Sequence, residues 1–194
     1  MSQIKLSSLI RCIFLTALVI FPFAAHQAAA YVVFCLDRSS TYPKWCSNLP
    51  PSIYTHVQST YWNVGFLRYW TLSQLPNFLI ASPPLVVISA FALDHFRSIL
   101  SEFQGVNGKI NHGTLGQNLC LTPHAIHATI FSSILLFASH TQIVLRLAAS
   151  MPFTYWAAAW LYMKYPTWGT LWVAWSVIWG LISGIFWATF LPPA

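Results

Sequence analysis

The chain has 194 residues, of which 57% are apolar and only 6% are charged. A typical soluble domain has about 25% charged residues, so this composition cannot cover a water-facing surface and predicts an integral membrane protein. The net charge of +6 comes from nine scattered Lys and Arg residues, which argues against nucleic-acid binding because that function needs a continuous basic surface.

The first apolar run, residues 12–36, carries no charged side chain and follows Lys5 and Arg11. A helix needs about 20 apolar residues to cross a bilayer, so we expect a first span over residues 9–30. The basic start and the Ala28–Ala30 ending are equally typical of a signal peptide, and both interpretations stay open. Lys5 and Arg11 favour a cytosolic N-terminus by the positive-inside rule.

Residues 31–75 form a polar and aromatic loop that this orientation places in the lumen, with a short interfacial helix near its end. Cys35 and Cys46 share this loop, and we expect them to form a disulfide if the loop is lumenal. Their spacing is not that of a zinc site, so we predict no metal centre.

Three further spans are predicted, over residues 76–94, 123–145 and 168–191. Residues 94–122 are expected to form a loop in which Asp94 ends the second span as a solvated helix end. The segment 151–165 reads as short and interfacial. The expected fold class is therefore an all-α, multi-pass transmembrane protein with about four spans in a single membrane domain covering residues 1–194.

The last predicted span carries two stripes of residues. One contains Trp168, Trp172, Trp175 and Trp179, which share a helical face. This face favours a packing stripe or an interface belt, and the alternative is one wall of a groove for a polyprenyl or acyl chain. On another face, Gly180 and Gly184 form a GxxxG pattern that predicts close packing with another helix of the same chain, or else dimerisation.

Residues 54–79 alternate aromatic rings with polar groups. Aromatic faces stack on sugars and Arg binds phosphate through paired donors, although an amphipathic interfacial helix has a similar composition. A cation at a membrane boundary, Arg146, is either a partner for lipid phosphate or a snorkelling side chain. The candidate substrate-binding residues are Gln58, Tyr61, Trp62, Asn63, Arg68, Asn77 and Arg146.

The order of several short motifs resembles the GPI mannosyltransferase 2 family, also called the PIG-V family. The motifs are YWNVGFLRYWTLSQLPNFLIASP at 61–83, PKWC at 43–46, PSIYTHVQ at 51–58, and the residues His140, Thr141, Gln142, Arg146, Pro152, Tyr155 and Trp156. The resemblance covers residues 11–194 and corresponds to the C-terminal portion of the family. Within the family, the first span here matches an internal helix, which favours a retained helix over a signal peptide.

The resemblance implies a C-type glycosyltransferase of the endoplasmic-reticulum membrane. Such an enzyme transfers the second mannose, in α-1,6 linkage, from dolichyl-phosphate-mannose to a GPI-anchor precursor on the lumenal face. No cofactor is implied beyond this donor substrate. The implied partners are membrane lipid, the precursor glycolipid, the donor and a small membrane accessory subunit.

The sequence departs from the family in its acidic residues. Family members carry a Trp-Asp motif in an N-terminal lumenal loop, where the catalytic base is expected, and no Trp-Asp pair occurs in these 194 residues. The acids present are Asp37, Asp94 and Glu102. We therefore assign no catalytic residue, and the alternative to an enzyme is a truncated, non-catalytic membrane protein or assembly partner.

Overall fold

The computed structural model describes residues 6–36, 43–103 and 112–189, and within these ranges it is helical without strands. Four helical segments are long and apolar enough to cross a membrane: Leu6–Cys35, Leu72–Glu102, Leu119–Phe137 and Pro166–Ala188. The prediction of an all-α, multi-pass membrane fold is confirmed. The chain divides into two compact units, Met1–Asn63 and Val64–Ala194, which we describe separately.

The first unit contains α1 (Leu6–Cys35), the 3-10 turn η1 (Lys44–Ser47) and α2 (Ile53–Tyr61). Ser52 caps the N-terminus of α2 by accepting a hydrogen bond from the Thr55 amide, which satisfies one of the donors that a helix start leaves open. The side-chain oxygen of Gln27 on α1 accepts bonds from the Ser52 hydroxyl and the Tyr54 amide. These contacts hold α2 against the second half of α1.

A disulfide joins Cys35, the last residue of α1, to Cys46 in η1. Trp45 is almost fully buried beside this bridge, and Tyr31 and Ile53 pack against it. The pair of cysteines is the one that the sequence suggested. The bridge and the small core around it hold η1 at the end of α1.

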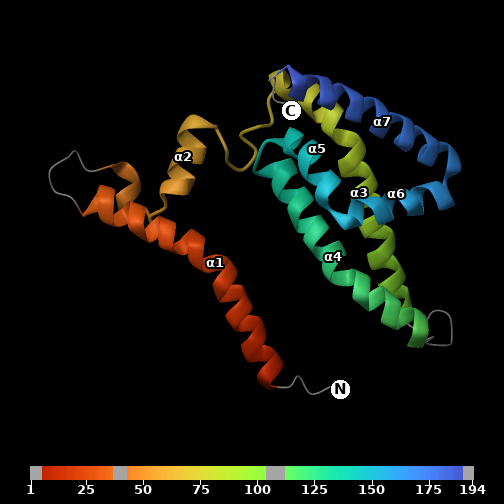
Figure 1. The fold of residues 1–194 in the computed structure, drawn as a ribbon, viewed down its shortest axis with the longest axis horizontal. Coiled ribbons are helices and arrows are strands. Elements are labelled where there is room, and N and C mark those ends of the chain that lie inside the picture. Colours follow the sequence, from red (N-terminus) through yellow and green to blue (C-terminus); the bar gives the residue numbers. More distant parts are fainter. Residues whose placement is uncertain (1–5, 37–42, 104–111, 190–194) are drawn as a thin grey trace. The chain divides into compact units, whose positions relative to one another are not determined.

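The second unit begins with a short loop and is then helical. Its elements are η2 (Leu72–Gln74), α3 (Leu75–Phe103), α4 (His112–Phe137), η3 (Thr141–Ile143), α5 (Val144–Leu147), η4 (Ala148–Ser150), α6 (Pro152–Lys164) and α7 (Pro166–Ala188). Figure 1 shows α3 beside α4, and α6 returning into α7 as a hairpin. Pro152 and Pro166 each stand in the first turn of a helix, where the missing N–H costs little.

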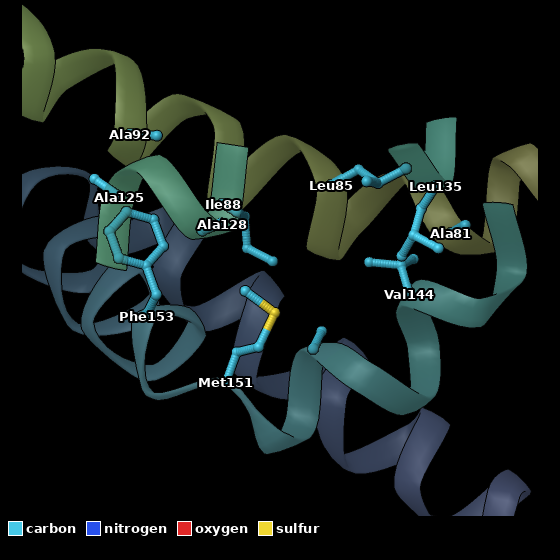
Figure 2. Packing of buried hydrophobic residues seen from close by; sticks show 11 residues of the cluster. Ala81, Leu85, Ile88, Ala92, Ala125, Ala128, Leu135, Val144, Met151 and Phe153 are labelled. Carbon is cyan, nitrogen blue, oxygen red and sulfur yellow. The ribbon is translucent and has the colours of Figure 1, made fainter. Parts of the chain in front are cut away.

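The core of this unit lies where α3 meets α4 and α6, and it is rich in small side chains. The α3 residues point inward at helical spacing, and alanines face them from α4. Because apolar side chains gain little by leaving lipid, close approach through small residues is what favours packing between membrane helices. Figure 2 shows Phe153 and Met151 directed toward the helices that carry Ala125 and Ile88. The buried set includes Ala81, Leu85, Ile88, Ala92, Ala125, Ala128, Leu135, Val144, Ala148, Met151 and Phe153.

Several element boundaries differ from the expectation, beginning with α1, which continues to Cys35 rather than ending near residue 30. α3 continues past Asp94 to Phe103, and α4 already begins at His112, so most of the loop expected over 94–122 is helical. With 29 residues α3 is about 43 Å long and exceeds a hydrocarbon core of about 30 Å, so its polar end can continue into water. α4 ends at Phe137 rather than near residue 145, and short helical turns follow it.

Candidate functional site

The loop that precedes α3 is fastened to the C-terminal end of α4. The backbone amide of Leu67 donates to the Phe137 carbonyl at 2.6 Å, and the Trp70 indole N–H donates to the Leu136 carbonyl at 2.7 Å. The Trp70 ring also stacks on Phe137, with ring centroids 5.8 Å apart. The last carbonyls of a helix have no partner within the helix, so this loop supplies donors that α4 lacks.

Leu67 adopts a left-handed backbone conformation, with φ of 58°. This region costs a residue with a Cβ atom roughly 1–2 kcal/mol. The hydrogen bond to Phe137 holds the conformation, and the Leu67 carbonyl accepts a bond from the Trp70 amide. A strained residue held from both sides fixes the direction in which the next residue, Arg68, leaves the loop.

Arg68 is exposed, and its aliphatic stem folds over Gly65. A Cβ atom placed on Gly65 would lie 2.8 Å from Cδ of Arg68 and 3.0 Å from its Nε. The Arg68 amide donates to the Gly65 carbonyl, which closes the turn. Gly65 therefore leaves room for the stem, while the loop presents the guanidinium group at the surface.

A partly buried polar network lies behind this loop and is centred on the buried Tyr69. The Tyr69 hydroxyl donates to the side-chain oxygen of Gln142 at 2.5 Å and accepts a bond from the Asn77 amide at 2.8 Å. Asn77 also donates to Gln74 at 2.6 Å, and the His140 ring lies edge-on to Tyr69. Burial raises the pKa of the Tyr69 phenol, and the Asn77 bond opposes this shift. The phenol is therefore protonated at neutral pH and ties α3 to η3.

The structure brings only some of the predicted binding residues together. Asn77 uses its amide donors inside the Tyr69 network, so its role here is to position the loop, and any substrate contact would fall to its amide oxygen. Arg146 is exposed on α5 in the same unit. The remaining predicted residues, Gln58, Tyr61, Trp62 and Asn63, belong to the first unit, at the end of α2.

In that first unit the aromatic residues of the predicted set are open to solvent or lipid. Tyr61 and Trp62 are 75% and 60% exposed, and Gln58 is half-buried on α2. Asn63 follows with φ of 51°, a conformation that Asn tolerates better than most residues. The end of α2 thus presents rings at a surface.

Asp94 is not the solvated helix end that the sequence predicted. Its carboxylate accepts a 2.6 Å bond from the Lys164 ammonium and a 2.9 Å bond from the Trp160 indole N–H. The ion pair therefore joins the middle of α3 to the end of α6. Both charged side chains remain about 40% exposed, so water screens the pair.

A groove lies within the same unit, between α7 and the segment from α5 to α6. Its volume is about 320 Å³, and three tryptophans of α7 form one wall. Trp172 stacks on Trp175 with centroids 5.2 Å apart, and Trp175 on Trp179 at 6.3 Å with nearly parallel planes. Part of the predicted tryptophan stripe therefore lines a groove. In the described ranges no group of three or more His, Cys, Asp or Glu side chains could hold a metal ion.

Sequence reasoning missed Tyr69, Gln142 and Leu67 as organising residues. Tyr69 and Gln142 lie far apart in the sequence, and only their separate resemblance to family motifs singled out the regions that contain them. The residue type gives no indication of the Leu67 conformation, because Leu rarely adopts a positive φ.

Known proteins share sequence similarity with nearly the whole of this chain. The family model "Mannosyltransferase (PIG-V)" matches residues 2–194. A GPI mannosyltransferase 2 of Cryptococcus neoformans is 38% identical over 93% of this chain and 46% of its own length. Those of Chaetomium globosum and Schizosaccharomyces pombe are 37% and 33% identical over 87% and 91% of this chain.

The chain spans less than half the length of these curated relatives, since it covers 38% of the Chaetomium protein and 35% of the Schizosaccharomyces protein. No solved structure gives a significant match. Because the family model covers nearly every residue of a helical, multi-pass chain, the chain belongs to the PIG-V mannosyltransferase family.

Proposed function

We propose that this chain is the C-terminal portion of a GPI mannosyltransferase 2, an enzyme of the endoplasmic-reticulum membrane. The complete enzyme transfers the second mannose, in α-1,6 linkage, from dolichyl-phosphate-mannose to a GPI-anchor precursor on the lumenal face. The observation that carries the proposal is the family match over residues 2–194, together with relatives that bear this name. A small membrane accessory subunit belongs to the same proposal.

The proposed role of residues 64–71 is to bind the phosphate of a lipid-linked substrate. Arg68 is exposed on a loop that two hydrogen bonds fasten to α4, and the network around the buried Tyr69 supports it from behind. A guanidinium group binds phosphate oxygens through paired, charge-assisted donors. A rigid loop improves such binding because less side-chain freedom is lost when the substrate arrives.

In the proposed reaction the acceptor hydroxyl attacks the anomeric carbon of the donor mannose. The bond between this carbon and the phosphate oxygen breaks, dolichyl phosphate leaves, and a base takes the hydroxyl proton. Asp94 is ill suited to be this base, because Lys164 and Trp160 engage its carboxylate at the junction of α3 and α6. No Trp-Asp pair, the motif in which the resemblance places the base, occurs in these 194 residues, so we propose that the base lies in the part of the enzyme outside them.

The test is Arg68→Ala in the intact enzyme, expressed in cells that lack their own second mannosyltransferase. Losing a charge-assisted hydrogen bond to phosphate costs about 1.5–3 kcal/mol, so the KM for the donor should rise about tenfold or more. Arg97→Ala is the matched control, because Arg97 is an exposed cation on α3 away from the loop. Unchanged mannose transfer by the Arg68 variant over a range of donor concentrations would remove Arg68 from the site.

A second candidate is a non-catalytic membrane protein or assembly partner, favoured by the engagement of Asp94 in an ion pair. The two candidates differ in a complementation assay. If the 194-residue chain alone restores the second mannose in deficient cells, the non-catalytic candidate is refuted. If only the intact enzyme restores it, this portion depends on the rest of the protein for chemistry.

A further inference from the structure

Three amide side chains form a row around Tyr69 where α3 begins. Gln74 lies in η2, Asn77 in the first turn of α3 and Gln142 in η3, and all three are half-buried. The Tyr69 hydroxyl donates to Oε1 of Gln142 and accepts from Nδ2 of Asn77. Nδ2 of Asn77 also donates to Oε1 of Gln74. We call Gln74, Asn77 and Gln142 the amide row.

The bonds within the amide row use only one end of each side chain. A side-chain amide has two N–H donors and an oxygen that accepts. The oxygens of Gln142 and Gln74 and the two N–H groups of Asn77 are engaged inside the row. Because each amide plane is held at that end, the other ends are fixed as a donor at Gln74, an acceptor at Asn77 and a donor at Gln142.

These outer ends have no partner within the part of the chain that the structure describes. No side chain or backbone group there bonds Nε2 of Gln74, Oδ1 of Asn77 or Nε2 of Gln142. None of the three is among the fully buried polar atoms that lack a partner, so each of them reaches the surface. A half-buried amide loses free energy unless a polar group from outside completes its bonds.

The fixed order of donor, acceptor and donor limits which group can complete the bonds. A phosphate diester offers only acceptors, which suit the two Gln nitrogens but oppose the Asn77 oxygen. An ammonium group offers only donors and opposes both nitrogens. A hydroxyl group both donates and accepts, so neighbouring hydroxyl groups can satisfy all three positions.

We propose that the amide row binds hydroxyl groups of a hexose, which makes Gln142 and Gln74 specificity-determining residues for the sugar. The inference rests on the proposed function, which supplies a hexose on the donor and on the acceptor. Tyr69 directly follows Arg68, so the hexose and the phosphate are recognised in one region by different side chains. The Tyr69 bonds thus fix the direction of the amides in addition to supporting the loop.

The experiment measures kcat/KM of the intact enzyme with two series of substrate analogues. In one series a single mannose hydroxyl of the donor is replaced by hydrogen, and in the other a single hydroxyl of the acceptor mannose, except the one that attacks. Losing a neutral hydrogen bond should lower kcat/KM about three- to tenfold. Gln142→Met should cause the same loss with the natural substrates, and removal of the contacted hydroxyl should then cost nothing further, because its partner is already gone. The series in which this happens identifies the hexose as that of the donor or of the acceptor.

Gln74→Met is the second variant if Gln142→Met does not fold, since it leaves both bonds of Tyr69 in place. Asn48→Leu is the control, because Asn48 is an exposed amide outside the row and its loss should change no ratio. A purely structural role would make the two losses multiply at every hydroxyl. That outcome in both series, with a folded variant, would overturn the proposal. Mannose transfer by the unmodified intact enzyme tests the proposed function itself, so multiplied losses in an active enzyme refute only the amide row.

Discussion

The indole N–H of Trp70 donates a hydrogen bond to the carbonyl oxygen of Leu136 across 2.7 Å, although 66 positions separate the two residues. The bond replaces a partner that the Leu136 carbonyl cannot find within its own helix, because α4 ends one residue later. One tryptophan thus terminates α4 and fixes the loop that carries Arg68.

Trp70→Phe should separate the hydrogen bond from the ring stacking. The phenyl ring can still lie on Phe137, but the Leu136 carbonyl loses its donor, so we expect a loss of about 1 kcal/mol in the free energy of unfolding. Thermal unfolding in detergent measures this change. Trp168→Phe is the control, since Trp168 is 66% exposed and should tolerate the change. Equal effects of both variants would contradict the capping role.

The approach of α6 to α7 depends on Gly169. A Cβ atom on Gly169 would lie 2.5 Å from Cα of Tyr162, a backbone atom that cannot turn away. Gly169→Ala should therefore force the hairpin apart and cost about 1–3 kcal/mol of stability, as overpacking does elsewhere. Thermal unfolding is again the measurement.

Gly180→Ala is the matched control for this change, because the added Cβ meets nothing and Ala favours a helix over Gly. We expect this variant to unfold at the same temperature as the unmodified chain or slightly above it. A loss at Gly180 as large as that at Gly169 would show that backbone flexibility, not the contact with Tyr162, decides the effect.

Composition was sufficient to predict the membrane class, and the lengths of the apolar runs predicted four long apolar helices, because the need to satisfy backbone groups in lipid leaves few alternatives. The helix ends were harder to predict. The sequence predicts Asp94 to be a solvated helix end. In the structure its carboxylate pairs with the Lys164 ammonium and accepts a hydrogen bond from the Trp160 indole N–H, both from α6. Such pairing depends on tertiary contacts, which residue patterns near Asp94 do not contain.

The candidate site, too, was only partly predictable from the sequence. The motif around Arg68 identified the loop, whereas the bonds that hold the loop come from Phe137, Leu136 and Gln142. The GxxxG pattern on α7 predicted a close contact, yet Gly169 is where the backbones meet. Spacing shows which residues share a face, but it does not show what covers that face.

The disulfide between Cys35 and Cys46 has a direct chemical test. In non-reduced, denatured protein a maleimide reagent should label the two remaining cysteines, Cys12 and Cys120. Reduction before labelling should raise the count to four. In the chain-entropy description a bridge closing a short loop contributes about 3 kcal/mol, so reduction should also lower the unfolding temperature. Four labels without reduction would show that the bridge does not form in the protein.

The ion pair between Lys164 and Asp94 predicts a dependence of stability on alkaline pH. The hydrogen bond to Asp94 raises the pKa of the Lys164 ammonium above its ordinary value. A raised pKa in the folded state means that the stabilisation is fully present below the ordinary pKa of Lys, about 10.4, and is lost as the pH rises through the folded value. The difference in unfolding temperature between the unmodified chain and Lys164→Met should therefore be constant from pH 7 to about 10 and shrink above it. Because both side chains are substantially exposed, the difference should be small and should decrease in high salt.

Lys164→Arg provides the control, since Arg stays protonated in this range and should keep its advantage over Met at high pH. A difference that does not change between pH 9 and pH 12 in the lysine protein would show that the charge of Lys164 contributes nothing to the junction of α3 and α6.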